Sequence, residues 1–157
     1  MMIVNILLIK MNSLSFRIVF QEVPDEISIC FCITGCPFSC KGCHSPELQN
    51  SNNGEFLSID EYKDILNKYK NLATCVCFMG GEWEKDFYKY LIIAKQNNYN
   101  TCLYTGNYYV SKLIMNNLDY LKVGPYQIKR GGLSNPNSNQ KFYDLNNNKI
   151  INNRFWR

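Results

Sequence analysis

The sequence predicts an α/β fold: a single-domain partial (β/α) barrel with a mostly parallel sheet, helices outside, and antiparallel edge elements at both termini. Three observations lead to this expectation. The length of 157 residues fits one domain, and apolar residues make up 46 % of the chain, which is enough for a sizeable core. In the middle of the chain, short apolar runs rich in β-forming residues alternate with segments of helical periodicity. Because strands joined by helices need right-handed crossovers, the neighbouring strands are expected to be parallel.

The expected strands and helices follow one another in a regular order. Residues 28–34 form an apolar run that ends at Gly35, which predicts a buried strand. Ser58 and Glu61 have the spacing of a capping box, and apolar residues at helical spacing continue from there to Tyr69. Beyond this helix we expect a strand at 74–79, a helix at 84–97, a strand at 100–104, a short helix at 109–116 and a strand at 120–123.

The flanks of the chain have a different pattern. Residues 16–23 are typical of an antiparallel edge strand, and residues 142–145 and 149–151 are typical of a terminal hairpin. Most of the central strands end at glycines: Gly35, Gly80-Gly81, Gly106 and Gly124. Because the carboxyl ends of parallel strands meet at one edge of the sheet, we expect the functional site at that edge.

The composition excludes several classes of protein. The net charge is +4 without a long basic run, which weakly favours an acidic partner and does not indicate nucleic-acid binding. The apolar runs are too short to span a membrane, and Met1–Lys10 lacks the basic flank and cleavage site of a secretory signal. A cytoplasmic protein is therefore expected. The single histidine, His44, excludes every mechanism that needs two histidines.

Three of the eight cysteines form a spaced group in the loop after the first expected strand. Cys36, Cys40 and Cys43 follow a Cys-x3-Cys-x2-Cys pattern, with Gly35 and Gly42 allowing a tight backbone. Three thiolates on a four-iron cluster leave one iron without a protein ligand, and this open position can bind a substrate. The group is therefore a candidate for a [4Fe-4S] site.

Other interpretations of the cysteines remain open. The loop cysteines and His44 could form a structural zinc site, although adjacent Cys43 and His44 would have difficulty reaching one tetrahedral ion. Disulfides are disfavoured in the reducing compartment that we expect. The remaining cysteines alternate with bulky apolar residues within strands, and we assign them to packing: Cys30, Cys32, Cys75, Cys77 and Cys102.

The cysteine spacing at the end of the first strand resembles that of the radical S-adenosylmethionine (SAM) superfamily. Met79-Gly80-Gly81-Glu82, after the second strand, is similar to the Gly-Gly-Glu motif of that superfamily. The resemblance implies one radical SAM domain over residues 1–157 and a [4Fe-4S] cluster on the three loop cysteines. In the superfamily, SAM chelates the open iron, and the Gly-Gly-Glu segment holds its methionyl ammonium. The implied SAM-binding residues are then Gly80, Gly81 and Glu82, together with Cys43 beside the cluster.

Further segments resemble the activating proteins of anaerobic (class III) ribonucleoside-triphosphate reductase. The similar segments are Gly42-Cys43-His44-Ser45-Pro46-Glu47, Tyr104-Thr105-Gly106, Asp119 to Gly124-Pro125-Tyr126, and Ser138-Asn139-Gln140-Lys141. This resemblance implies that Gly42 and His44 contact the adenine and that Thr105 and Gly106 also contact the cofactor. The chain departs from the usual pattern at Gly42, where an aromatic residue is common, and at Pro24-Asp25-Glu26, where Asp-Gly-Pro-Gly is common.

The function implied by the resemblance is installation of a glycyl radical on the reductase. An electron from a flavodoxin-like or ferredoxin-like donor would cleave SAM to methionine and a 5′-deoxyadenosyl radical, which would take hydrogen from a glycine of the reductase. We expect Asn139 and Gln140 at the mouth of the site, with Lys129, Arg130 and Lys141 as a basic rim for the partner. Activation of another glycyl-radical enzyme is an alternative, and a non-catalytic zinc- or cluster-binding docking module is a second.

Overall fold

The computed structural model describes residues 11–156. The segment Met1–Lys10, for which the sequence predicts no secretory signal, therefore lies outside the described residues. Across residues 11–156, none of the helices has the length and apolar character needed to cross a membrane.

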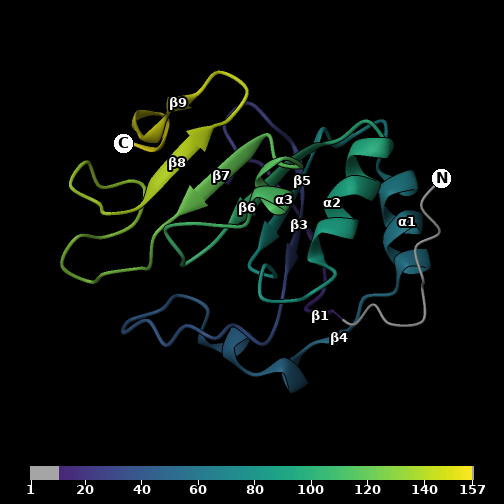
Figure 1. The fold of residues 1–157 in the computed structure, drawn as a ribbon, viewed down its shortest axis with the longest axis horizontal. Helices are drawn as coiled ribbons and strands as arrows, with labels where there is room; N and C mark the ends of the chain where they lie inside the picture. The colour runs from purple at the N-terminus through teal and green to yellow at the C-terminus, as the bar shows by residue number, and fades with distance from the viewer. Residues whose placement is uncertain (1–10, 157) are drawn as a thin grey trace.

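The described chain folds as an α/β structure (Figure 1). Its strands are β1 (Asn12–Ser13), β2 (Arg17–Val19), β3 (Ser28–Cys32), β4 (Glu55–Phe56), β5 (Cys75–Met79), β6 (Asn100–Tyr104), β7 (Tyr120–Val123), β8 (Lys141–Asp144) and β9 (Lys149–Ile150). Its α-helices are α1 (Ile59–Lys68), α2 (Phe87–Gln96) and α3 (Lys112–Met115), and its 3-10 helices are η2 (Pro46–Gln49), η3 (Ser51–Asn53) and η4 (Asn152–Phe155).

A mixed seven-stranded sheet organises the fold, in the order β2-β3-β5-β6-β7-β8-β9. The central strands β3, β5, β6 and β7 are parallel, whereas β2, β8 and β9 are antiparallel to their neighbours. The predicted parallel centre and antiparallel flanks are thus confirmed. Closure of the sheet into a partial barrel stays a prediction. The small pair of β1 and β4 was not expected, because each strand has only two residues.

Strict alternation of side chains gives the sheet two different faces. In β3, Ile29 and Phe31 join the large core cluster, whereas Cys30 lies on the opposite face. In β5, Val76 and Phe78 likewise join the large cluster, and the two cysteines of this strand face the other way. In-register pairing of Cys77 with Cys30 and Cys102 then makes a row of thiols across three strands.

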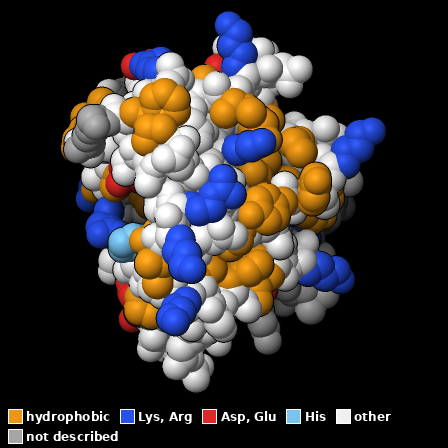
Figure 2. All heavy atoms as spheres, turned by 90° about the vertical axis from the view of Figure 1, so that its left-hand side faces the viewer, with side chains coloured by type: hydrophobic (Ala, Val, Ile, Leu, Met, Phe, Trp, Pro, Cys, Tyr) orange, Lys and Arg blue, Asp and Glu red, His pale blue; other side chains and the backbone are white. Residues whose placement is uncertain are grey.

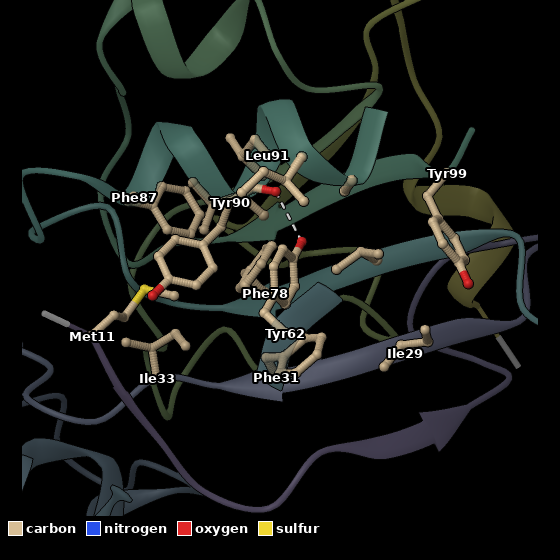
Figure 3. Packing of buried hydrophobic residues seen from close by; sticks show 14 of the residues in the cluster. Met11, Ile29, Phe31, Ile33, Tyr62, Phe78, Phe87, Tyr90, Leu91 and Tyr99 are labelled. Carbon is tan, nitrogen blue, oxygen red and sulfur yellow. Dashed lines mark hydrogen bonds between the residues drawn. The ribbon is translucent and has the colours of Figure 1, made fainter. Parts of the chain in front are cut away.

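The helices pack on the face that carries the large apolar side chains (Figure 3). Tyr62 of α1 and Tyr90 of α2 are fully buried there, and their rings meet edge-on at a centroid distance of 5.0 Å. The Tyr62 hydroxyl donates to the Tyr90 carbonyl at 2.9 Å, and the Tyr90 hydroxyl donates to the Leu57 carbonyl at 2.6 Å. These buried hydroxyls are therefore satisfied, and all three α-helices contribute to this one core cluster.

The opposite face is covered by loops and by the C-terminal segment. Val23, Leu133 and Phe142 pack there against the buried cysteines, with Phe155 of η4 beside them. Burial raises the pKa of Cys75 and Cys102, so these thiols stay protonated. The assignment of the five strand cysteines to buried positions is confirmed.

Most helix boundaries follow their capping residues. Ser58 Oγ accepts a hydrogen bond from the Glu61 backbone N–H at 3.1 Å, so α1 begins where the sequence predicts. Two helices are shorter than expected. α2 begins at Phe87 because residues 82–86 form turns, and α3 begins after Ser111, whose hydroxyl caps it.

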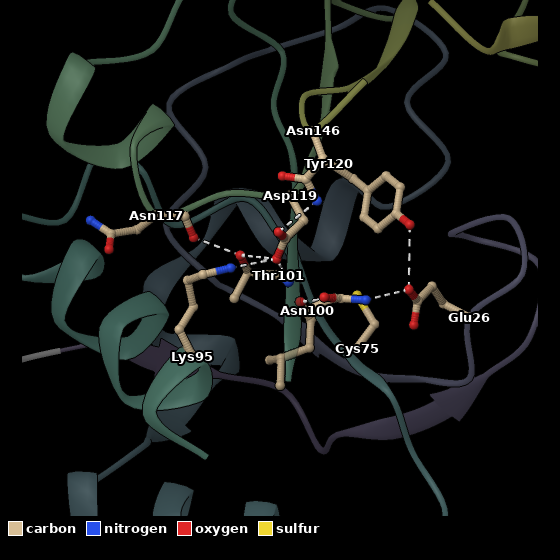
Figure 4. A network of polar contacts seen from close by, with 10 residues as sticks. Glu26, Cys75, Lys95, Asn100, Thr101, Asn117, Asp119, Tyr120 and Asn146 are labelled. Atoms are coloured by element: carbon tan, nitrogen blue, oxygen red, sulfur yellow. Dashed lines mark hydrogen bonds and ion pairs between the residues drawn. The ribbon is translucent and has the colours of Figure 1, made fainter. Parts of the chain in front are cut away.

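A polar network ties together the amino ends of the central strands (Figure 4). Asp119, which precedes β7, accepts hydrogen bonds from Lys95 Nζ at 2.7 Å, from the Thr101 N–H at 2.9 Å and from Asn146 Nδ2 at 3.0 Å. At the neighbouring strands, Glu26 accepts a hydrogen bond from Asn100 Nδ2 at 2.6 Å. The network therefore anchors the edge of the sheet opposite the strand-end glycines.

Substituting Asp119 tests this anchor. Burial acts to raise the pKa of Asp119, but the hydrogen bonds from Lys95, Asn146 and Thr101 outweigh it, and the net pKa lies below the ordinary value. A lowered pKa in the folded state stabilises the protein above the unfolded pKa of about 4, and this contribution is lost as the pH falls below it. We expect Asp119→Asn to lower the free energy of unfolding by about 2 kcal/mol at pH 7. The difference in the free energy of unfolding between Asp119→Asn and the native chain, measured from urea unfolding curves, should shrink toward pH 3. Exposed Asp64→Asn is the control, and an equal loss in both variants would contradict the anchoring role.

Candidate functional site

The carboxyl ends of the four parallel strands meet at one edge of the sheet. Backbone hydrogen bonds continue beyond the strands there: the Gly80 N–H donates to the Tyr104 carbonyl at 2.9 Å, and the Thr105 N–H donates to the Lys122 carbonyl at 2.9 Å. The Ile33 N–H donates to the Met79 carbonyl in the same way, at 3.0 Å. The segments that follow β3, β5, β6 and β7 are therefore held side by side.

The cysteine loop begins at this edge and crosses the ends of the neighbouring strands. Thr34 holds its start, with its hydroxyl donating to the Asn12 and Ser51 carbonyls, both at 3.2 Å. Further along, the ring of Phe38 lies so close to Gly106 that a Cβ there would stand 3.1 Å from it. The loop thus rests on the end of β6 and reaches toward β7.

The loop thiols differ from the strand thiols in exposure. Cys36, Cys40 and Cys43 are partly exposed, whereas the five strand cysteines are buried. The Ser45 N–H donates to the Cys43 sulfur at 3.4 Å. Burial raises the pKa of Cys36, and the nearby Glu82 carboxylate and the other two loop thiols raise it further. The three thiols are therefore close enough to act on one another electrostatically.

These thiols do not converge on a single point. Among residues 11–156, no three His, Cys, Asp or Glu side chains lie close enough together to hold a metal ion. A mononuclear site on the three cysteines and His44 is thus not preformed. A four-iron cluster binds its thiolates at separate corners, and the donor set of three accessible thiols on one loop fits that group in kind and number.

A cavity of about 580 Å³ lies between the cysteine loop and the sheet. Of the residues that the sequence predicts for the site, those that line this cavity are Cys36, Cys43, His44, Gly80, Thr105 and Gly106. Cys40, Gly42, Gly81 and Glu82 are not in its lining. The volume falls within the range of small-molecule sites, so the cavity is large enough for an organic cofactor.

Glu82 is a partly buried carboxylate beside the cavity with one oxygen unsatisfied. Its Oε1 accepts a hydrogen bond from the Thr105 hydroxyl, while its Oε2 is buried with no hydrogen-bond partner among the described residues. Burial raises the pKa of Glu82, and the hydrogen bond from Thr105 partly opposes this effect. A buried carboxylate oxygen without a donor is unfavourable, and a cationic ligand would relieve that cost.

Lys122 supplies the opposite charge at the same edge. Its ammonium donates to the Thr105 carbonyl at 3.2 Å and to the Gly124 carbonyl at 3.0 Å, and it lies over the Tyr104 ring. Burial lowers the pKa of Lys122 to about 8. The side chain lines the cavity, so a titratable cation and the partly buried Glu82 carboxylate both stand at the ends of the parallel strands.

The glycines predicted to contact the cofactor have different surroundings. Gly80 lies under the Trp83 ring, and a Cβ there would stand 2.3 Å from the ring. Gly81 faces the core instead, where a Cβ would stand 2.9 Å from Phe87 and 3.1 Å from Ile33. A Cβ at Gly81 would therefore press on the core and not project into the cavity, and a backbone contact of Gly81 with the cofactor stays a prediction. Gly42 faces the loop after β7, with a Cβ there 2.7 Å from Ile128.

His44 and one of the two residues expected at the mouth of the site line the cavity, whereas the other does not. The His44 ring is exposed and meets the Tyr126 ring edge-on at 4.8 Å, at the cavity lining. Gln140 lines the cavity, as expected, but Asn139 does not. The Asn139 amide instead donates to the Tyr108 hydroxyl at 3.1 Å and to the Pro125 carbonyl at 2.9 Å, so it ties loops together.

Sequence reasoning missed several residues that line the cavity. They are Arg17, Glu22, Cys30, Cys32, Phe38, Trp83, Lys122 and Tyr126, among others. Lys122 carried a usable signal, because a lysine between Leu121 and Val123 interrupts an otherwise apolar strand. Cys30 and Cys32 are buried as expected, yet they also form part of the cavity wall.

Comparison with known proteins gives one family. The sequence model of the family described as "4Fe-4S single cluster domain" matches residues 27–130, which is more than half of the chain. The matched range includes the cysteine loop and β3 to β7. Neither the curated proteins nor the solved structures gave a match.

Substitution of Gly81 separates a core role from a cofactor role. Its φ of +113° is strained for any other residue, and a Cβ would press on Phe87 and Ile33. We expect Gly81→Ala to lower the free energy of unfolding by at least about 2 kcal/mol in the protein without cofactors. Gly132→Ala is the control, since a Cβ there meets only Gln140 at 3.7 Å. Equal thermal unfolding midpoints for the two variants would show that Gly81 does not face the core.

Proposed function

The chain belongs to the family of 4Fe-4S single cluster domains, and we propose that it is a radical SAM enzyme that installs the glycyl radical of an anaerobic ribonucleoside-triphosphate reductase. One observation carries the proposal. A single cavity of about 580 Å³ joins the cysteine loop to the strand ends that follow β5 and β6. An iron–sulfur cluster and an organic cofactor would therefore lie next to each other.

In this proposal Cys36, Cys40 and Cys43 hold the [4Fe-4S] cluster. They are the partly exposed cysteines of the described chain, and two of them line the cavity. The other five are buried in the sheet, where burial and neighbouring thiols hold their pKa values above the ordinary range. Because an iron–sulfur cluster must reach its thiol ligands, the partly exposed cysteines of the loop are the better ligands.

Glu82 would bind the methionyl ammonium of SAM. Its Oε2 is buried with no hydrogen-bond partner in the described residues, and the hydrogen bond from the Thr105 hydroxyl fixes the orientation of the carboxylate. Gly80 and Gly106 expose backbone to the cavity next to it, and His44 stands at the rim, where the adenine would lie. A charge-assisted contact of this kind accounts for a carboxylate in a partly buried position.

When bound, the cluster and SAM would supply the chemistry: one-electron reductive cleavage of SAM, and abstraction of hydrogen from a glycine Cα of the reductase. The protein would orient and enclose these two groups. The thiols place the cluster, Glu82 orients the methionyl group, and Phe38 and Tyr126 wall the cavity. Exclusion of water protects a reactive species from side reactions.

The partner is expected to approach the face that carries the loops. In Figure 1 the cysteine loop and the loop between β7 and β8 extend on the left, and Figure 2 views that side. Lys and Arg side chains are spread over it among hydrophobic groups, with few acidic ones. Lys129, Arg130 and Lys141 are exposed in and after this loop, and they would provide the basic rim for an acidic surface of the reductase. A flavodoxin-like or ferredoxin-like donor would supply the electron.

The decisive experiment is anaerobic reconstitution with iron and sulfide, followed by addition of SAM and dithionite. We expect about four irons per chain, formation of 5′-deoxyadenosine and methionine, and a glycyl radical signal after addition of the reductase. Cleavage of SAM without that signal would favour another glycyl-radical enzyme as the partner. One bound zinc and no cleavage would favour a docking module and would overturn the proposal.

Cysteine substitutions test the ligand assignment. Changing Cys36, Cys40 or Cys43 to Ala should abolish the four-iron cluster, because each removes one of three ligands. Buried Cys75→Ala and Cys102→Ala should retain the iron and lose only modest thermal stability. Iron and sulfide contents and the visible absorption spectrum measure the outcome. Complete loss of iron in Cys75→Ala would contradict the division of the cysteines.

Glu82→Gln tests the ammonium contact without changing the size of the side chain. We expect SAM to bind about 10- to 100-fold more weakly, because a hydrogen bond to a charged group is lost. The SAM-induced change in the electron paramagnetic resonance spectrum of the reduced cluster reports binding. Glu84→Gln is the matched control, since Glu84 lies two residues away and its carboxylate is not one of the buried groups without a hydrogen-bond partner. Unchanged SAM affinity in Glu82→Gln would remove Glu82 from the site.

A further inference from the structure

Trp83 carries a buried hydrogen-bond donor that nothing in the described chain accepts. Its indole Nε1 is inaccessible to solvent and has no partner within residues 11–156. The side chain lines the cavity and packs at the margin of the main core. An indole N–H can only donate, so its acceptor must come from outside the described protein atoms. Without such an acceptor, the unfavourable burial of the N–H is not compensated.

The two ends of the indole ring lie against two glycines of the site. A Cβ on Gly80 would stand 2.3 Å from Cη2 of Trp83, at the six-membered ring. A Cβ on Gly35 would stand 3.6 Å from Nε1, at the other end of the ring system. Gly35 is the residue directly before Cys36. The N–H of Trp83 is thus located next to the residue that precedes Cys36.

The conformation of the chain keeps this arrangement in place. Gly80 and Gly35 both have positive φ values, +79° and +87°, and neither has a side chain to displace the ring. The Glu84 N–H donates to the Gly81 carbonyl at 2.9 Å, which closes the turn that contains Trp83. The indole is therefore held between the end of β5 and the cysteine loop before any ligand binds.

We propose that the Trp83 Nε1–H donates a hydrogen bond to sulfur at the Cys36 corner of the bound cluster and so raises its reduction potential. The inference rests on the proposed ligation by Cys36. Reduction adds negative charge to the cluster and its sulfur ligands, and a donor aimed at sulfur stabilises that charge. Trp83 is a positioning residue in this sense: it acts on the cluster and not on the substrate glycine.

The first test uses the native side chain. The chain has two tryptophans, and Trp156 is exposed near the C-terminus, so Trp156→Phe leaves Trp83 as the only indole. With indole-¹⁵N tryptophan incorporated, pulsed electron paramagnetic resonance of the reduced cluster should show ¹⁵N coupling in the absence of SAM. Absence of coupling, or coupling that appears only after SAM is added, would overturn the inference.

The second test measures the reduction potential. Trp83→Phe keeps an aromatic ring against Gly80 but removes the N–H, and we expect its midpoint potential to shift to a more negative value. Trp156→Phe should have the potential of the native protein. Equal potentials in Trp83→Phe and native protein, at equal iron content, would overturn the inference. Failure of the proposed function is distinguishable, because the native chain would then bind no four-iron cluster or would not cleave SAM.

Discussion

The alternation of side chains along β3, β5, β6 and β7 is the constraint on which the rest of the structure depends. One face of these strands carries large apolar side chains, against which the three helices pack. The other face carries thiols, Tyr104 and Lys122. Since the side-chain period of a strand is two, a one-residue shift in register would exchange the faces. The small thiols leave space on the second face, and the cavity occupies part of it at the carboxyl edge.

The two edges of the sheet differ in how well their carboxylate groups are hydrogen-bonded. At the amino edge, Asp119 and Glu26 accept hydrogen bonds from several elements, so their carboxylates are satisfied. At the carboxyl edge, Glu82 Oε2 and the Trp83 N–H are buried without partners in the described residues. Buried polar groups of the second kind reduce stability in the free protein and increase the gain from binding. The carboxyl edge thus holds an unsatisfied carboxylate oxygen and an unsatisfied indole N–H, whereas the unsatisfied group at the amino end of β3 is the Ser28 hydroxyl.

The charged groups at the carboxyl edge of the sheet suit a zwitterionic ligand. Glu82 accepts one hydrogen bond, from Thr105, and keeps one oxygen without a partner, whereas Lys122 donates two hydrogen bonds, with burial lowering its pKa to about 8. An amino acid group such as the methionyl part of SAM carries both complementary charges. The side chains that would recognise it come from strand ends that are paired by backbone hydrogen bonds, so their spacing is fixed by the sheet.

The sequence by itself determined whatever depends on local spacing. Strand alternation, the Ser58 cap of α1, the burial of the strand cysteines and the three-cysteine loop could all be predicted, because each is set by neighbours along the chain. Only the tertiary structure decided which residues far apart in the chain contact one another. It turned Gly81 toward Phe87, shortened α2 with a turn that carries Trp83, and buried Lys122 beneath the loop ends. Such contacts join residues far apart in the chain, and packing between elements selects them where local propensity leaves several arrangements open.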